Sequence, residues 1–171
     1  QSLIARKADI FTRNKDKDTT LLLAVKAGSL AACRALVQHD ARIINERNRK
    51  LSCHFAFHLA AQLNHTAIVE LMIDHEAEVN KRGSNRATAL MLAARNNHIK
   101  TARVLLDHGA DINMRTSNNG TTALHSAAFK GHVKMVKLLL RKNANISLVS
   151  KANKTALQLA ETMGKHNVIR I

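Results

Sequence analysis

The chain has 171 residues, with 27 Lys and Arg against 12 Asp and Glu, and its net charge of +15 favours an acidic partner. It contains no Trp, Tyr or Pro and only four Phe, so it offers little aromatic surface for stacking bases as single-strand binders do. Two cysteines form no disulfide framework, and no apolar run approaches the roughly 20 residues of a membrane span. Residues 1–11 also lack a signal-peptide core, and these absences favour a cytoplasmic or nuclear protein.

A unit of about 33 residues recurs along the chain. Successive copies begin 33 to 36 residues apart, at Thr19, Phe55, Thr88, Thr122 and Thr155. Self-similarity at this period indicates a stack of small similar units rather than the core of a globular enzyme. Residues 1–18 match the end of a preceding copy, and the last copy is partial. We therefore expect one repeat domain over residues 1–171 that forms a segment of a longer array.

Each copy predicts the same elements in chain order, most clearly in the copy that begins at Thr122. Thr122 is a suitable N-cap for a first helix over residues 123–128, which Gly131 ends. A second helix is predicted from apolar residues at helical spacing, Val133, Val136, Leu139 and Leu140. Asn143, like Gly109 in the previous copy, stands where a left-handed C-cap is needed. The polar segment that follows predicts a loop, which is longer by about three residues between Arg42 and Ser52.

These motifs resemble those of the ankyrin repeat family over essentially the whole chain. The matching segments are Thr122-Ala123-Leu124-His125, Ala127-Ala128, Gly131-His132, Leu138-Leu139-Leu140 and Gly109-Ala110-Asp111-Ile112-Asn113. The resemblance implies an all-α solenoid of stacked helix-turn-helix units with protruding loop fingers. The proline that the family has after the capping threonine is replaced here by Thr20, Ala56, Ala89, Ala123 and Ala156. Phe55 stands in place of the family's capping threonine, and Met91 stands in place of its histidine.

The ten histidines suggest metal or acid–base chemistry, but eight of them share repeat positions and are interpreted as structural. The shared positions hold His58 and His125, then His65, His98 and His132, then His39, His75 and His108. The strongest metal candidate is Cys53-His54 with His58, for which no fourth ligand is evident.

His75-Glu76 begins like a zincin motif, but Val79 stands where the second histidine is required. The chain also lacks a Gly-rich phosphate loop and a context for a serine nucleophile. We therefore expect no enzyme activity, metal or cofactor in this segment, although a flanking domain could be catalytic.

The resemblance implies that the inner face of each first helix and the fingers form a concave groove for partner proteins. The expected inner-face contacts are Lys26, Leu63, Arg95, Phe129, Lys130 and Met163, with Phe129 as the aromatic anchor. The expected finger contacts are the cations Arg47, Arg49, Lys50, Lys81, Arg82, Arg86 and Arg115. Further finger cations are Arg13, Lys15, Lys17, Arg42, Lys151 and Lys154, which makes 13 of the 27 basic residues.

Three functional hypotheses follow. The first is a non-catalytic scaffold that holds an acidic protein surface or segment in the groove. The second is binding of a polyanion, either nucleic acid or an anionic membrane surface. The third is the targeting module of a larger enzyme or of a bacterial effector, in which case the protein would be secreted into a host cell. A salt titration separates the first two, because binding to nucleic acid releases counterions and depends steeply on salt.

Overall fold

The structure is a computed structural model that describes residues 9–45 and 55–171. The chain divides into two compact units, unit 1 (Gln1–Glu78) and unit 2 (Val79–Ile171). Every regular element among the described residues is helical, and extended backbone pairs only in an isolated bridge between Arg13 and Thr19. The predicted all-α class is therefore confirmed, whereas a single domain over residues 1–171 stays a prediction.

Unit 1 contains two pairs of α-helices and one short 3-10 helix among its described residues. The elements are α1 (Thr20–Lys26), α2 (Leu30–His39), η2 (Ala41–Asn45), α3 (Ala56–Gln62) and α4 (Thr66–Asp74). Helix α1 packs against α2 and α3, and α4 packs against α2 and α3. The core between these helices includes Leu21, Val25, Cys33, Val69 and Met72, all fully buried. Each pair therefore buries its apolar face against the other pair, as stacked repeats do.

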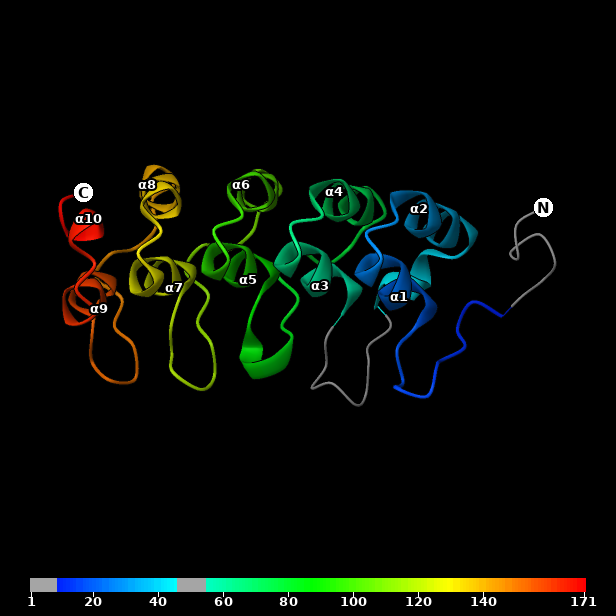
Figure 1. The fold of residues 1–171 in the computed structure, drawn as a ribbon, viewed down its shortest axis with the longest axis horizontal. Helices are drawn as coiled ribbons and strands as arrows, with labels where there is room; N and C mark the ends of the chain where they lie inside the picture. The colour runs from blue at the N-terminus through cyan, green and yellow to red at the C-terminus, as the bar shows by residue number, and fades with distance from the viewer. Residues whose placement is uncertain (1–8, 46–54) are drawn as a thin grey trace. The chain divides into compact units, whose positions relative to one another are not determined.

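Unit 2 repeats the pattern with three pairs of helices. The elements are η3 (Ser84–Arg86), α5 (Ala89–Arg95), α6 (Ile99–Asp107), α7 (Ala123–Lys130), α8 (Val133–Arg141), α9 (Ala156–Thr162) and α10 (His166–Ile169). The first helices α5, α7 and α9 pack in one row, the second helices α6, α8 and α10 pack in another, and the fingers project from the first row (Figure 1). Leu105, Met135 and Leu139 are fully buried between the rows.

Threonine caps begin the first helices of unit 2, as the sequence predicts. The Thr88, Thr122 and Thr155 hydroxyls each accept a hydrogen bond from the backbone N–H three residues later. The side chain three residues later accepts in return from the backbone N–H of the threonine, which completes a reciprocal cap. In unit 1, Thr19 accepts a bond from the N–H of Leu22, whereas Phe55 makes no capping bond. The expected loss of a cap at Phe55 is confirmed.

The helix ends follow the predicted turn chemistry. Helix α7 ends at Gly131, whose φ of 77° is left-handed and favours glycine. After the second helices, Gly109 and Asn143 adopt φ of 81° and 59°, which confirms their predicted role. These turns bring each chain segment back to the finger side before the next first helix begins.

One part of the predicted long loop is helical. Arg42 lies in η2, where Ile43 and Ile44 are buried, so the loop does not begin at Arg42 as expected. The Arg42 guanidinium donates hydrogen bonds to the Asp40 carboxylate and lowers the pKa of Asp40 to about 2. The sequence-based placement of Arg42 in a finger is therefore wrong, because residues 41–45 form a separate 3-10 helix that buries the two isoleucines. The remainder of that loop lies outside the described residues.

Candidate protein-binding surface

In unit 2, large apolar side chains remain in solvent near the ends of neighbouring first helices, in addition to Leu157 in the first turn of α9. Phe129 on α7 is 40 % exposed and Met163, the C-cap residue of α9, is 42 % exposed. Helix α7 packs directly against α9, and the two residues occupy adjacent repeat positions, seven and eight residues after the capping threonines. The structure therefore brings two of the predicted contact residues onto neighbouring helices.

Cations flank this apolar pair. Lys130 follows Phe129 in the last turn of α7 and is exposed, and Arg95 holds the position of Phe129 one repeat earlier, on α5. The backbone carbonyl of Arg95 accepts a hydrogen bond from His132 Nε2 at 3.0 Å, which ties two successive repeats together. Since α5 packs against α7, the Arg95 guanidinium lies one repeat away from the aromatic ring.

Unit 1 shows the same apolar exposure at its first helices. Leu23 on α1 is 41 % exposed, and Leu63 at the end of α3 is 42 % exposed. Helices α1 and α3 pack together, so these leucines form a second apolar pair on neighbouring first helices. Of the two, Leu63 was an expected inner-face contact. Unit 1 thus offers an apolar surface of the same kind as unit 2.

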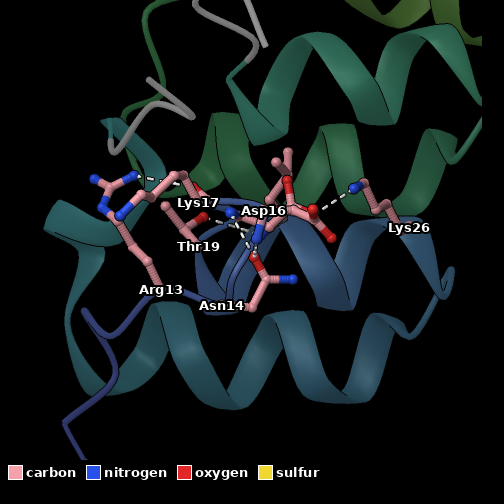
Figure 2. Close-up of polar contacts among 8 residues, drawn as sticks. Arg13, Asn14, Asp16, Lys17, Thr19 and Lys26 are labelled. Carbon is pink, nitrogen blue, oxygen red and sulfur yellow. Dashed lines mark hydrogen bonds and ion pairs between the residues drawn. The ribbon is translucent and has the colours of Figure 1, made fainter. Parts of the chain in front are cut away.

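Lys26 has an intramolecular role that the sequence analysis did not assign. Its ammonium group lies 2.5 Å from Oδ2 of Asp18, a carboxylate that is only 2 % exposed at the base of the first finger (Figure 2). A buried carboxylate is costly unless it is paired, so the Lys26 ammonium compensates the negative charge of Asp18 at the base of the finger. Lys26 remains 43 % exposed and still borders the apolar surface of unit 1.

The finger that holds Asp18 is organised by an asparagine. Oδ1 of Asn14 accepts hydrogen bonds from the backbone N–H groups of Asp16 and Asp18, both at 2.9 Å (Figure 2). The Asn14 N–H donates to the carbonyl of Asp18 at 3.1 Å, and Lys17 turns the chain with a left-handed φ of 63°. This Asx-type turn fixes the path of the backbone into helix α1.

The fingers of unit 2 are hydrogen-bonded to one another through their backbones. The N–H of Ser117 donates to the carbonyl of Asn85 at 2.7 Å, and the N–H of Lys151 donates to the carbonyl of Asn119 at 2.8 Å. Each finger is also closed on itself, for example by the bond from Thr116 N–H to the Thr121 carbonyl at 3.0 Å. The three fingers are therefore braced by their neighbours.

Several finger cations are engaged in this bracing. The Arg115 guanidinium donates to the carbonyls of Gly120 at 3.0 Å and Val149 at 2.5 Å. The Lys151 ammonium donates to the carbonyl of Ser117 at 2.6 Å, which joins two fingers. Lys154 Nζ donates to Thr162 Oγ1 at 2.8 Å, which joins a finger to helix α9. Arg115, an expected partner contact, is thus first of all a structural residue of its finger.

Two other finger cations take no part in the bonds between fingers. Arg82 and Arg86 are exposed, and their side chains form no hydrogen bond or ion pair with the described residues. Arg86 sits in a left-handed conformation with φ of 57°, which costs a non-glycine residue roughly 1 kcal/mol. Lys81 is half-buried and has an intramolecular contact. Of the predicted finger contacts that the structure describes, Arg82 and Arg86 are therefore the most open to a partner.

Some predicted residues lie outside the described part of the chain. These are the finger cations Arg47, Arg49 and Lys50 and the candidate metal ligands Cys53 and His54. Within residues 9–45 and 55–171, no group of three or more His, Cys, Asp or Glu is placed to hold a metal ion. Cys33 is fully buried, and this burial raises the pKa of its thiol to about 11.

The structural interpretation of the histidines is confirmed where their bonds are defined. His125 is buried, its Nε2 donates to the carbonyl of Lys154 at 3.2 Å, and its Nδ1 bonds Thr122 at 2.8 Å. Burial lowers the pKa of this imidazole below its usual value. His75 and His108 each bond the carbonyl four residues earlier with Nδ1, at 2.9 and 2.8 Å. Their ring nitrogens thus hold helix ends and loops in place.

Paired helices, reciprocal caps and braced fingers define a helical repeat protein. The sequence model described as Ankyrin repeat matches residues 54–84, and the one described as Ankyrin repeats (many copies) matches residues 90–140. The chain belongs to the ankyrin repeat family, whose repeats are in general protein–protein interaction modules and typically non-catalytic. No curated protein matches the sequence.

Among the described residues, no helix has the length and apolar character needed to cross a bilayer.

Proposed function

We propose that the chain binds a partner protein through the finger side of its first helices and that the partner presents an acidic surface or segment. The observation that carries the proposal is the exposure of Phe129 and Met163 on the adjoining helices α7 and α9. An aromatic ring left in water contributes little to the fold, but it becomes an anchor when a partner covers it. The partner therefore has an apolar group that reaches these two side chains.

Charge supports the acidic character of the partner. Lys130 and Arg95 flank the apolar pair, and Arg82 and Arg86 extend from the finger before α5. Cations at the rim of an interface mainly accelerate association and select partners of opposite charge. Arg86 occupies a position that glycine fits better, as Gly120 does one repeat later, so its side chain costs stability and supplies charge instead.

The binding test uses a protein captured from a cell extract by the full 171-residue chain and then purified. Phe129→Ala should weaken its binding about 30-fold, which corresponds to roughly 2 kcal/mol for a hot-spot residue. Leu157→Ala is the matched control, because Leu157 is also an exposed apolar residue of unit 2, at 51 %, but lies in the first turn of α9. Equal losses for the two variants would contradict the proposal.

The charge test uses the same captured protein. Arg82→Glu combined with Arg86→Glu should slow association at low salt and leave the dissociation rate nearly unchanged. A loss that appears only in the dissociation rate would contradict a steering role for these cations. A log–log salt slope near −0.9 per neutralised phosphate would instead indicate a nucleic acid carried by the captured material.

A further inference from the structure

The second helices of unit 2 carry a set of exposed cations on the face away from the first helices. This outer basic face comprises Lys100, Arg103, Lys134, Lys137, Arg141 and Arg170. On α8, Lys134, Lys137 and Arg141 are three and seven residues apart, which places all three on one side of the helix. Lys100 and Arg103 have the same three-residue spacing on α6.

The cations also align from one repeat to the next. Arg103, Lys137 and Arg170 occupy the same repeat position, 15 residues after Thr88, Thr122 and Thr155. Helix α6 packs against α8, and α8 packs against α10, in a single row (Figure 1). Packed helices lie about 8–10 Å apart, so the three charges are spaced at intervals of roughly that length. The outer face is therefore a two-dimensional array of positive charge.

This charge is not balanced within the described chain. None of the six cations forms a hydrogen bond or ion pair with a described residue. Asp107, the one acidic residue in α6, α8 and α10, is held by Lys142 at 2.7 Å and also interacts electrostatically with Arg103, so one negative charge stands against the six cations. Like charges at these separations repel one another, so the array lowers stability rather than adding to it. The finger cations Arg115 and Lys151, by contrast, donate hydrogen bonds to backbone carbonyl groups of unit 2.

The repeat fold does not require cations at these positions. In unit 1, this repeat position holds the exposed Arg34 on α2 but Glu70 on α4, and Asp74 follows Glu70 on the same helix. Both carboxylates are exposed, as the cations of unit 2 are. Helix α4 packs in the same way with acidic residues outside, so the fold accepts either charge at this position, whereas unit 2 carries a cation there in each of its repeats.

We infer that the outer basic face of unit 2 binds the surface of an anionic phospholipid bilayer through the acidic groups of the lipid headgroups. Lipids diffuse laterally, so they match any spacing of cations on a broad helical layer. Nucleic-acid readers instead insert a helix or ribbon into a groove or stack bases on aromatic rings. The row α6, α8 and α10 offers no separate element of this kind, and its outer cations have no aromatic residue among them.

The inference is independent of the proposed protein partner. Bilayer contact uses the second helices, whereas Phe129 lies on the first helix α7 and Met163 caps the first helix α9. A membrane-bound molecule would therefore keep its protein-binding surface open to the solution. The attraction is electrostatic, and it falls off within the Debye length of about 8 Å at physiological salt.

The experiment is co-sedimentation of the full chain with large unilamellar vesicles of phosphatidylcholine containing about one third phosphatidylserine. Each Lys or Arg near such a surface contributes about a fivefold gain in partitioning, so Lys134→Gln, Lys137→Gln and Arg141→Gln together should lower partitioning about 100-fold. The matched control replaces three exposed cations of the finger side, Arg82, Arg86 and Lys130, by Gln, with the same change in net charge. Circular dichroism establishes that both triple variants are folded.

The expected result is strong loss for the outer-face variant, a loss of no more than a few fold for the finger-side variant, and no binding to pure phosphatidylcholine. Equal losses for the two variants would overturn the inference, because net charge alone would then explain binding. So would failure of the wild-type chain to bind the anionic vesicles at 100 mM salt. Displacement from the vesicles by duplex DNA, with the outer-face cations required for DNA binding, would assign the face to nucleic acid and also overturn it.

Discussion

Units 1 and 2 build the same helix pairs with different stabilising chemistry. In unit 2, all three first helices begin with a reciprocal threonine cap. In unit 1, Thr19 caps in one direction only and Phe55 does not cap, but Phe55 is itself buried and stacks near His58, with ring centroids 5.5 Å apart. The comparison teaches that a repeat can replace a polar cap with apolar burial and still begin its helix at the same position.

The largest expected difference between the units concerns Leu21 and Leu157, which share a repeat position. Leu21 is fully buried, so Leu21→Ala should lower the free energy of unfolding by roughly 2–5 kcal/mol, whereas Leu157 is 51 % exposed and Leu157→Ala should change it by less than about 1 kcal/mol. Urea unfolding followed by circular dichroism measures both values.

Cys33 offers a local probe of the same change. Its thiol is buried and, with a pKa of about 11, stays protonated near neutral pH, so it should be alkylated only when unit 1 opens. In a Cys53→Ser background, Leu21→Ala should accelerate alkylation of Cys33. Leu157→Ala should not accelerate it, and similar rates for the two variants would contradict the assignment of Leu21 to the core of unit 1.

The next effect concerns Lys26 and Thr162, which lie seven residues after Thr19 and Thr155. Lys26→Met leaves the buried Asp18 carboxylate without its cation and should destabilise the protein by about 1–2 kcal/mol, less than for a fully buried pair because Lys26 is partly exposed. Thr162→Ala removes two exposed hydrogen bonds, one accepted from Lys154 Nζ and one donated to the Gln158 carbonyl, and should cost less than about 0.5 kcal/mol. Thermal unfolding of both variants at one pH provides the measurement.

The cap of α7 should make unit 2 sensitive to acid. Burial lowers the folded pKa of His125 below its unfolded value near 6.5, so the unfolded state binds the proton more readily. The stability from neutral His125 is present above pH 6.5 and is lost as the pH falls through the folded pKa, because protonated Nδ1 no longer accepts a bond from Thr122.

His125→Gln is the matched variant, because Gln158 already forms this reciprocal cap in the next repeat, with Oε1 2.9 Å from the N–H of Thr155. The difference in melting temperature between pH 7.5 and pH 5 should be smaller in this variant than in the wild type, because glutamine does not titrate in this range. An unchanged difference would show that other groups carry the acid sensitivity.

The smallest effect concerns Lys17 and Gly120, which stand two residues before Thr19 and Thr122 with φ of 63° and 64°. Lys17→Gly relieves a left-handed lysine but makes the unfolded chain more flexible, so it should stabilise by only about 0.5 kcal/mol. Gly120→Ala should destabilise by more, since its Cβ would lie 2.9 Å from Nη2 of Arg115 and 3.3 Å from the backbone N of Lys151. Chemical unfolding of the two variants tests the sign of each change.

The sequence was sufficient for the features that depend on neighbours along the chain. The repeat period, the threonine caps and the left-handed Gly109 and Asn143 follow from local patterns, and all are confirmed. The pair formed by Asp18 and Lys26 was missed, because it joins a finger to the end of a helix eight residues away and neither residue is unusual by itself. A carboxylate before the cap with a lysine two turns later was the available signal.

The candidate site was predicted less completely than the fold. Exposure of Phe129, Leu63 and Met163 follows from their place in the repeat, but the roles of the finger cations do not. Arg115 and Lys151 reach carbonyl groups of adjoining fingers, and such contacts depend on loop conformations that repeat spacing does not specify. Positive charge in the fingers therefore did not distinguish structural cations from those open to a partner.

The backbone bonds between the fingers of unit 2 have a practical consequence for engineering. Ser117 donates to the preceding finger and Asn119 accepts from the following one, so Asn118 alone lies between the two linking residues. A foreign epitope grafted directly after Asn118, at the tip of the turn formed by residues 117–119, would leave both links at its flanks. One grafted between Asn119 and Gly120 would instead separate the link at Asn119 from Gly120, whose carbonyl accepts a bond from Arg115. Asn118 is accordingly the position at which a tag should be tolerated best.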